Sequence, residues 1–438
     1  MSVDLDIARK DLLAACGEIR ETSLAGAKGG TDLTGEAGLP AFVAMPGSTV
    51  EAAAVMRVAA EHELAVVVRG GGSRLDWGVP ASRCDVVVDT SRMSGVLEHA
   101  AGDLVARLQA GTRMGDVAAV LARAGQEIAL DVPADATVGG VVASGLAGPR
   151  RLRYGTPRDL LIGLTIVRAD GTVAKSGGKV VKNVAGYDLG KLFAGSAGTL
   201  GLITEATFRL HPLPAARAYV TAEYVAVSVA CDAVAAAANS PLVSSAVELT
   251  RAEPGRPIRV GVLLEGSADG VEARSMRMAD LLGKAEVGTE PPAWWPGSPR
   301  AAAGETLIRV SFWVSALPRV LDAIEAAADR ADVSPLIAGS AGAGVLYLRA
   351  SGPAAAVAGF ARALRDGLAR DQGGAAGGER GAVVVLAAPS AVREELAARD
   401  GMNAGMNGAV PGLALMRAVK DQFDPGHRMA PGRFPEGS

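Results

Sequence analysis

Glycine clusters directly after short apolar runs are the feature of this sequence that most limits its possible folds. Between residues 41 and 213, apolar runs that read as strands alternate with segments that read as helices, such as the run 65–69 after the helical segment 49–62. Alternating strands and helices are typical of mixed α/β layers. A glycine run after a buried strand lets the backbone turn its N–H groups toward a bound phosphate. We therefore expect a mixed α/β domain whose loops carry a ligand site.

The pattern changes from about residue 216. The order strand, helix, strand, strand, helix is predicted over 219–282, and it repeats over 307–388 after a proline-rich break at 291–296. Two such halves predict a second domain with a ferredoxin-like or doubled antiparallel sheet backed by helices. The glycine-rich segment 371–380 is expected to be a mobile loop.

Charge and hydropathy exclude several classes of protein. The 438 residues include 44 basic and 47 acidic side chains, a net charge of −3 with no long basic run, which argues against a nucleic-acid-binding protein. Hydrophobic residues make up 49% of the chain, so global disorder is excluded. The sequence shows no secretory signal and no apolar stretch of about 18 residues. We expect a cytoplasmic protein without a membrane span, whose association with membranes, where it occurs, comes through partners.

The number and spacing of the cysteines limit which metal sites this chain could form. Cys16, Cys84 and Cys231 are far apart and form no C-x-x-C motif, so an iron–sulfur or zinc site built from this chain alone is not expected. An odd and sparse set of cysteines fits reduced thiols rather than a disulfide framework.

The first candidate site is the stretch 66–78, where a buried strand runs into Arg69-Gly-Gly-Gly-Ser-Arg74. Its glycines would let the backbone approach a diphosphate, and Arg69 and Arg74 would add positive charge. The stretch fits neither G-x-G-x-x-G nor the P-loop pattern. A plain glycine turn is the alternative.

Two further stretches are rich in small residues. In 131–155, Thr137, Ser144 and paired glycines offer small donors and open backbone, as a flat aromatic ligand with a ribityl chain requires. In 175–205, lysines, Asn183 and Tyr187 stand among glycines before an apolar strand. The alternatives are a packed turn for the former and a solvated basic turn for the latter.

Taken in order, these stretches resemble the FAD-binding domain of the vanillyl-alcohol-oxidase (PCMH-type) superfamily, and most of all the FAD-binding subunits of bacterial glycolate oxidase (glycolate dehydrogenase) complexes. The matching pieces are Arg69-Gly-Gly-Gly-Ser, Ala136-Thr-Val-Gly-Gly, Arg153-Tyr-Gly-Thr-Pro-Arg-Asp, Gly178-Lys-Val-Val-Lys-Asn-Val-Ala-Gly-Tyr-Asp and Gly198-Thr-Leu-Gly-Leu-Ile-Thr-Glu. The closing Asp424-Pro-Gly-His-Arg-Met-Ala-Pro-Gly-Arg is similar to the family's D-P-x-x-x-x-N-P-G, with Ala430 in place of Asn.

The resemblance implies an α+β protein with a PCMH-type FAD-binding domain of two α/β subdomains and a ferredoxin-like (doubled β-α-β) cap domain. The implied domains are an N-terminal helical segment at 1–40, the FAD-binding domain at 41–215, the cap at 216–395, and a segment at 396–438 that returns to the FAD domain.

The resemblance also implies the cofactor and its contacts. FAD would bind without a covalent link, because Ser73 stands where many relatives carry the histidine that attaches it. The implied FAD contacts are Arg69, Gly70, Gly71, Gly72, Ser73, Arg74, Pro133, Thr137, Gly139, Gly140, Ser144, Gly145, Gly148, Tyr154, Gly198, Thr199, Gly201 and Ile203.

One departure from the family limits the expected mechanism. Catalytic 2-hydroxy-acid dehydrogenases of the superfamily carry histidine motifs in the cap, which bind a metal and take the hydroxyl proton. The four histidines here are His62, His99, His211 and His427, and none lies within 216–395. For each, a structural role is favoured, so no catalytic residue or metal ligand is assigned.

Three functions follow as alternatives. The leading one is an FAD-binding subunit of a glycolate (2-hydroxy acid) oxidase complex, partnered by a catalytic flavoprotein subunit and an iron–sulfur subunit that receives electrons. The second is a self-sufficient FAD-dependent 2-hydroxy acid or alcohol oxidase with Lys182, Tyr154, Tyr187 or Arg153 as its polar catalytic group. The third is a flavin-fold scaffold without turnover, for which Trp294 and Trp295 would be a docking patch. Packing of these tryptophans under the linker is the favoured alternative.

Overall fold

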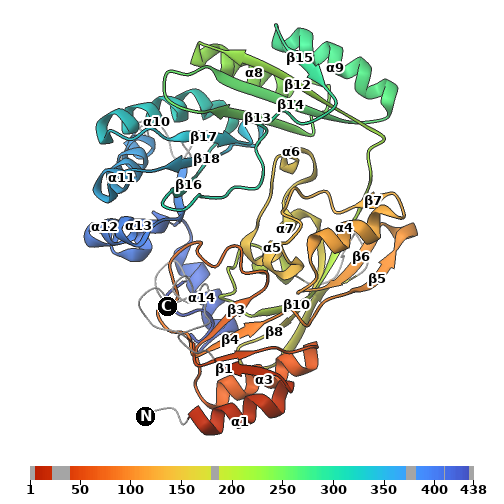
Figure 1. The fold of residues 1–438 in the computed structure, drawn as a ribbon, viewed down its shortest axis with the longest axis vertical. Helices are drawn as coiled ribbons and strands as arrows, with labels where there is room; N and C mark the ends of the chain where they lie inside the picture. Colours follow the sequence, from red (N-terminus) through yellow and green to blue (C-terminus); the bar gives the residue numbers. More distant parts are fainter. Residues whose placement is uncertain (1–4, 22–39, 179–186, 371–380, 409, 434–438) are drawn as a thin grey trace. The chain divides into compact units, whose positions relative to one another are not determined.

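The computed structural model describes residues 5–21, 40–178, 187–370, 381–408 and 410–433 (Figure 1). The chain forms two compact units. The first comprises Met1–Leu146, Thr156–Leu213 and Val410–Ser438, and the second comprises Ala147–Gly155 and Pro214–Ala409. The glycine-rich loop predicted at 371–380 lies outside the described residues.

The described residues of the first unit form two main sheets and a short two-stranded one (Figure 1). The four-stranded sheet has the order β1 (Ile19–Glu21), β2 (Phe42–Ala44), β4 (Val86–Asp89) and β3 (Val66–Arg69), with β2, β4 and β3 parallel and β1 antiparallel. The five-stranded antiparallel sheet has the order β5 (Val96–Ala100), β6 (Val105–Gln109), β10 (Leu202–Arg209), β8 (Leu161–Val167) and β9 (Val173–Gly177). A two-stranded sheet pairs β7 (Gln126–Glu127) with β11 (His211–Pro212).

Helices cover both main sheets of this unit. Buried residues of α1 (Leu5–Cys16) and α3 (Thr49–Glu61) form one core with the four-stranded sheet. Those of α4 (Met114–Ala122) and α5 (Val138–Ser144) form another with the five-stranded sheet. Ser48 begins α3, because its hydroxyl accepts a hydrogen bond from the Glu51 N–H. The remaining short helices are η1 (Ala101–Asp103), α7 (Pro157–Leu160) and η2 (Leu189–Phe193).

The C-terminal tail completes the four-stranded sheet. After α14 (Leu413–Phe423), the chain turns so that Met429 pairs in parallel with Val66 of β3. The Val66 N–H donates to the Arg428 carbonyl, and the Ala430 N–H donates to the Val66 carbonyl. Residues 410–433 of the described tail, apart from the surface of α14, therefore join the first unit through backbone pairing as well as packing.

The second unit contains one eight-stranded antiparallel sheet. Its strand order is β15 (Glu286–Gly288), β12 (Ala216–Tyr224), β14 (Ile258–Gly266), β13 (Ala246–Arg251), β17 (Leu336–Gly339), β18 (Val345–Ala350), β16 (Thr306–Ser311) and β19 (Ala382–Ala387). Each half has the strand order of a ferredoxin-like β-α-β-β-α-β unit, and β13 joins β17 to make one sheet. The predicted α+β class with a doubled β-α-β cap is confirmed.

The helices of the second unit are α6 (Arg151–Tyr154), α8 (Val227–Asn239), α9 (Ala268–Leu282), η3 (Val314–Ala316), α10 (Leu317–Ala331), η4 (Ala341–Ala343), α11 (Ala354–Arg370), α12 (Ser390–Asp400) and α13 (Met402–Asn407). On β13, Arg251 pairs with Glu325 of α10, so the odd-numbered side chains face the helices. The even-numbered Glu248 and Thr250 lie on the opposite face, which we call the open face.

Three sequence expectations differ from the structure. The expected return to the FAD domain at 396 begins only at Val410, because α12 and α13 pack on α11 and β19. Residues 147–155, expected inside the first domain, group with the second. The glycine-rich stretch after 131 contains the helix α5, because Val138, Val141 and Val142 share a buried face that outweighs the two glycines.

Candidate functional site

A glycine turn at the end of β3 is the first part of the site. Gly70 lies so close to Thr137 that a Cβ there would be 2.2 Å from the Thr137 hydroxyl oxygen. The Gly71 N–H donates to that hydroxyl at 3.4 Å. Gly71 and Gly72 are exposed, and Gly72 has a φ of +76°, which favours glycine. The turn thus presents bare backbone to solvent while its first residue is held against the start of α5.

Helix α5 is positioned by close backbone contacts. The Thr137 hydroxyl caps it by accepting from the Gly140 N–H at 3.3 Å, and Gly145 ends it with a φ of +64°. Gly139 donates to the Ala110 carbonyl at 2.8 Å, where a Cβ would be 2.9 Å from the Ala110 side chain. Larger residues at 139 would push the helix away from β6.

The loop at 195–199 lies against the other end of α5. The Gly195 N–H donates to the Val142 carbonyl at 2.9 Å, and the Ala197 N–H donates to the Ala143 carbonyl at 2.8 Å. Ser144 is half-buried and donates to the Gly140 carbonyl at 2.7 Å. The structure thus brings together members of all three glycine-rich stretches around one short helix. We call this assembly of residues 70–74, 137–145 and 195–201 the glycine cradle.

The two arginines at the cradle interact with neighbouring groups of the protein. Arg69 forms an ion pair with the buried carboxylate of Asp89, at 2.7 Å and 2.9 Å from two guanidinium nitrogens. Arg74 lies over the ring of Trp77, 4.9 Å from its centroid. The positive charge predicted at Arg69 is therefore balanced by Asp89, and the cradle offers mainly backbone groups.

A buried ion pair holds the last part of the cradle. The Lys420 ammonium donates to the Thr199 carbonyl at 2.8 Å, to Asp424 at 2.6 Å and to the Met429 carbonyl at 3.1 Å. Both charged side chains are fully buried, and burial lowers the pKa of Lys420 although Asp424 opposes that shift. The closing D-P-G motif therefore fixes the 195–201 loop, with Gly201 and the buried Ile203 leading into β10.

The cradle fits an extended cofactor with a diphosphate. Bare backbone at Gly71, Gly72 and Gly140 leaves space that side chains would fill, and the turn follows the carboxyl end of a parallel strand. Pro133, half-buried, precedes the Thr137 cap on the same segment. These residues could hold FAD through backbone donors and small hydroxyls.

Two residues expected at the cofactor lie in a different compact unit from the cradle. Gly148 and Tyr154 belong to the second unit, where Glu265 of β14 binds their segment. The fully buried Glu265 carboxylate accepts from the Tyr154 hydroxyl at 3.2 Å and from Arg217 at 2.9 Å, and it lies 3.6 Å from Arg150. Burial, with the charge of Glu265, raises the pKa of Tyr154. Arg153 donates to the Glu265 carbonyl at 3.2 Å, so both side chains fix the segment 147–155 on the open face.

The tryptophan pair lies on the open face of the cap sheet. Trp295 meets Tyr219 edge to face, with ring centroids 4.9 Å apart. A Cβ on Gly261 of β14 would lie 2.7 Å from Trp294 and 2.8 Å from Trp295, so the rings occupy the space that this glycine leaves. The interpretation of packing under the linker is confirmed.

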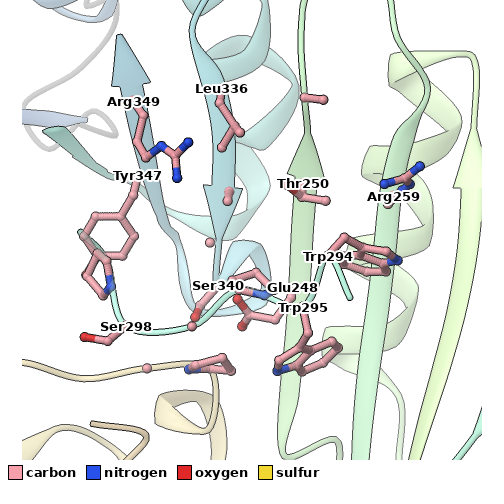
Figure 2. Close-up of a pocket in the computed structure, with 18 of the residues that line it drawn as sticks. Glu248, Thr250, Arg259, Trp294, Trp295, Ser298, Leu336, Ser340, Tyr347 and Arg349 are labelled. Atoms are coloured by element: carbon pink, nitrogen blue, oxygen red, sulfur yellow. The ribbon is translucent and has the colours of Figure 1, made fainter. Parts of the chain in front are cut away.

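A pocket of about 700 Å³ lies on this face, within the second unit (Figure 2). Figure 2 shows the carboxylate of Glu248 among its lining residues, with Ser340 and Tyr347 on one side and the tryptophans on the other. No motif of the sequence had indicated a role for Glu248, Thr250, Tyr347 or Arg349. Alternation in strand β13 was the available signal, because it places a glutamate among buried apolar neighbours.

The histidines have local partners. His62 lies 2.9 Å from Asp11, His99 lies 2.9 Å from Gln126, and His427 lies 3.1 Å from Asp421. His211 is 3.5 Å from Arg209. Among the described residues, no group of three or more histidine, cysteine or acidic side chains is arranged to hold a metal.

Two other features bear on the alternatives raised by the sequence. Lys182 and Asn183 lie outside the described residues, and Tyr187 is exposed. All three cysteines are buried as free thiols, and burial raises the pKa of Cys84 to about 12 and that of Cys231 to about 11. In the described part of the chain, no helix is both long and apolar enough to cross a membrane.

Comparison with known proteins relates most of this chain's first 177 residues to a known domain family. Residues 40–177 match the family described as "FAD binding domain". The glycolate oxidase subunit GlcD of Bacillus subtilis is 33% identical over 216 residues, which are 48% of this chain and 45% of that protein. The glycolate oxidase subunit GlcE of Escherichia coli is 38% identical over 154 residues, 34% of this chain and 43% of that one. The chain thus spans less than half the length of these relatives.

Solved structures share the whole fold. Over 99% of this chain and 97% of the other, p-cresol methylhydroxylase superposes with a TM-score of 0.75 at 15% identity. A chitooligosaccharide oxidase superposes over 98% of both chains with a TM-score of 0.68 at 15% identity. The predicted resemblance to PCMH-type flavoproteins is confirmed, and with it the α+β FAD-binding fold.

Proposed function

We propose, from the FAD-binding domain at residues 40–177, that the chain is an FAD-dependent oxidoreductase that acts on a 2-hydroxy acid such as glycolate or lactate. The convergence of three small-residue stretches on α5 carries this proposal, because it supplies the open backbone that FAD requires. The relatives named as glycolate oxidase subunits, and a D-lactate dehydrogenase of Archaeoglobus fulgidus that is 38% identical over 171 residues (39% of this chain and 38% of that protein), support the substrate class.

Different residues of the cradle would bind different parts of FAD. When bound, FAD supplies the acceptor for a hydride or electron pair. Backbone N–H groups of Gly71 and Gly72 would bind its diphosphate, and Thr137 with Gly139, Gly140, Ser144 and Gly145 would line the ribityl and ring region. Gly198, Thr199 and Gly201 would contact it from the loop that Lys420 fixes.

We also propose that FAD binds without a covalent bond, because Ser73 cannot form the link that a histidine provides. Acid precipitation of the purified yellow protein tests this. We expect flavin in the supernatant, and a yellow pellet would contradict the proposal.

The finer proposal is that the chain works as one subunit of a glycolate oxidase-type complex, with a catalytic flavoprotein and an iron–sulfur protein as partners. The printed names of two relatives are those of subunits, and the four histidines here pair with local groups rather than with one another. An assay of the purified chain with glycolate, D-lactate and an artificial acceptor tests it. We expect slow turnover alone and faster turnover after partners are added.

A self-sufficient oxidoreductase is the second candidate. It is favoured by the pocket on the open face, which contains a buried carboxylate and several arginines within one unit. Rapid turnover by the chain alone would support this candidate and contradict the subunit proposal. A colourless preparation that takes up no FAD would contradict both.

A further inference from the structure

The segment 147–155 contributes part of the lining of the pocket on the open face. Its residues Gly148 and Arg151 line the pocket together with residues of the cap sheet and of the proline-rich linker. The buried Glu265 carboxylate accepts from the Tyr154 hydroxyl at 3.2 Å and so holds the segment on β14. The Arg151 side chain is therefore presented to the pocket from a fixed backbone.

The charge of Arg151 is balanced differently from the charges of the other arginines in the lining. Three of those each lie close to a carboxylate: Arg256 with Glu253 at 3.9 Å, Arg259 with Glu223 at 2.5 Å and Arg349 with Glu305 at 3.1 Å. The remaining one, Arg300, is exposed. Arg151 is half-buried, and in the described part of the chain it donates to the carbonyls of Ala147 and Gly148 and to the Tyr347 hydroxyl.

Neutral acceptors orient the Arg151 guanidinium without neutralising it. A cation that is partly removed from water is stabilised most by an anion, because charge-assisted hydrogen bonds are stronger than those between a charged and a neutral group. The Glu248 carboxylate in the lining does not contact a ligand, since both of its oxygens are inaccessible. The pocket thus offers an oriented positive group to an incoming anion.

The Tyr347 hydroxyl gives the same place a second donor. Its oxygen accepts from Arg151 at 3.1 Å, and the guanidinium lies 5.8 Å from the centre of the Tyr347 ring. A phenol that accepts one hydrogen bond can donate another, so a ligand oxygen beside Arg151 can receive the Tyr347 hydrogen. Figure 2 shows Arg349 next along β18 after Tyr347, where it adds positive charge to the same wall.

Apolar side chains line the rest of the pocket. Trp294 and Trp295 are half-buried and occupy the space above Gly261, and Leu307 and Leu336 also belong to the lining. A pocket of about 700 Å³ with such a lining suits a ligand that carries a ring, and a two-carbon acid would fill only a small part of it.

We propose that Arg151 and Tyr347 form a carboxylate-binding site in this pocket, for an organic acid that carries an aromatic ring. The carboxylate accepts hydrogen bonds from both side chains, and the ring lies against the tryptophans. Binding of the acid uses residues of the second unit alone. That the bound acid is also the 2-hydroxy acid that is oxidised rests on the proposed function.

A pair of ligands of equal shape tests the inference on the full FAD-loaded chain. Phenylacetate has no hydroxyl group, so the proposed reaction cannot consume it, and phenylacetamide is its neutral counterpart. By calorimetry we expect phenylacetate to bind at least about tenfold more tightly, because only the acid forms charge-assisted bonds with Arg151. Equal affinities, or no binding of phenylacetate, would overturn the proposal.

Variants of Arg151 connect the preference for the acid to one side chain. Arg151→Gln removes the charge, so the preference for phenylacetate over phenylacetamide should be lost. Arg151→Lys keeps the charge without the planar fork and should restore part of the preference. Arg277→Gln, which removes an exposed charge from α9 of the same unit, is the matched control and should behave as the unchanged chain. A preference that survives in the glutamine variant would contradict the assignment.

Tyr347→Phe decides the matter where a change at Arg151 prevents folding. It keeps the ring beside the guanidinium and removes only the hydroxyl. We expect the affinity for phenylacetate to fall about threefold to tenfold, because one donor to the carboxylate is lost. Unchanged affinity in a folded Tyr347 variant would remove this residue from the site and contradict the two-donor arrangement.

A small acid tests the role of the apolar lining. We expect acetate to bind about tenfold or more weakly than phenylacetate because it buries less apolar surface. Equal binding of the two acids would refute the selection for a ring.

Flavin reduction keeps this inference separate from the proposed function. Bleaching of bound FAD by glycolate, D-lactate or mandelate is recorded on the same preparation without oxygen. Bleaching without any binding of phenylacetate would overturn the pocket assignment and leave the proposed function standing. Phenylacetate binding that Arg151→Gln abolishes, without bleaching by any of the three acids, would support the carboxylate site and count against turnover by this chain.

Discussion

The glycine cradle and the open-face pocket are built on opposite principles. In the cradle, backbone and small side chains form the surface, and charged groups such as Arg69 and Lys420 pair inside the protein. In the pocket, arginines and aromatic rings form the surface around the buried Glu248, and glycine at 261 makes room for the two tryptophans. Backbone contacts suit a cofactor whose shape does not vary, whereas a pocket lined by side chains can select the shape and charge of a ligand.

The largest effect is expected where charge supports the cradle. Lys420→Ala leaves Asp424 buried without its ammonium, which should cost about 3–5 kcal/mol of folding free energy. Denaturant unfolding measures it. Lys191→Ala breaks an exposed pair with Asp188 and should cost less than about 1 kcal/mol. Similar costs for the two variants would show that the buried pair is not a structural support.

The next effect concerns the backbone surface of the cradle. Gly70→Ala would place a methyl group 2.2 Å from the hydroxyl that caps α5, so FAD affinity should fall about tenfold or more. Titration with FAD, followed by flavin fluorescence, measures it. Gly102→Ala, in the same unit and with open space around it, is the control. Unchanged affinity in the Gly70 variant would remove the turn from the cofactor site.

A smaller effect is expected for the corresponding glycine of the pocket. Gly261→Ala would press on Trp294 and Trp295, which are half-buried and can shift, so we expect a loss of about 1 kcal/mol. Near-ultraviolet circular dichroism should show the altered tryptophan packing. Gly288→Ala, whose new Cβ meets nothing closer than 3.7 Å, should leave the spectrum as it is. An unaltered spectrum for the Gly261 variant would mean that the rings do not depend on this glycine.

The smallest effect is expected in the rates at which thiol reagents label one cysteine in each unit. Cys84 lies in the first and Cys231 in the second, and the raised pKa of each keeps it in the unreactive thiol form at pH 8. Removal of FAD should speed labelling of Cys84 several-fold and change Cys231 little, because a ligand stabilises the unit that binds it. Mass spectrometry after alkylation separates the two. Equal acceleration at both would mean that the units open together.

These thiols also predict how stability depends on pH. Their folded-state pKa values are raised above the ordinary 9.0, so the folded state keeps its protons longer than the unfolded state does. Their contribution is complete below about pH 9 and is lost as pH rises toward 11–12.

The cofactor cradle was largely predictable and the pocket was not. Thr137, Gly139 and Gly145 were expected at the cofactor from the resemblance to the flavoprotein family, and the structure places them on one short helix beside the glycine turn. Arg69 was expected to add free charge, yet its partner Asp89 comes from the next strand of the sheet, twenty residues away. Glu248 comes to lie opposite Gly261 only when β13 pairs with β14, so the alternation in β13 could mark an unusual glutamate but not the pocket that it lines.

The sequence by itself determined the two-part α+β organisation and the glycine-rich loops expected at FAD, because strand periodicity and glycine turns are properties of neighbouring residues. The tertiary structure decided that 147–155 joins the second unit through Glu265, that α12 and α13 stay with the cap, and that a carboxylate lies in a pocket of arginines and tryptophans. Those outcomes depend on which strands pair and which faces are buried, and long-range packing alone sets both.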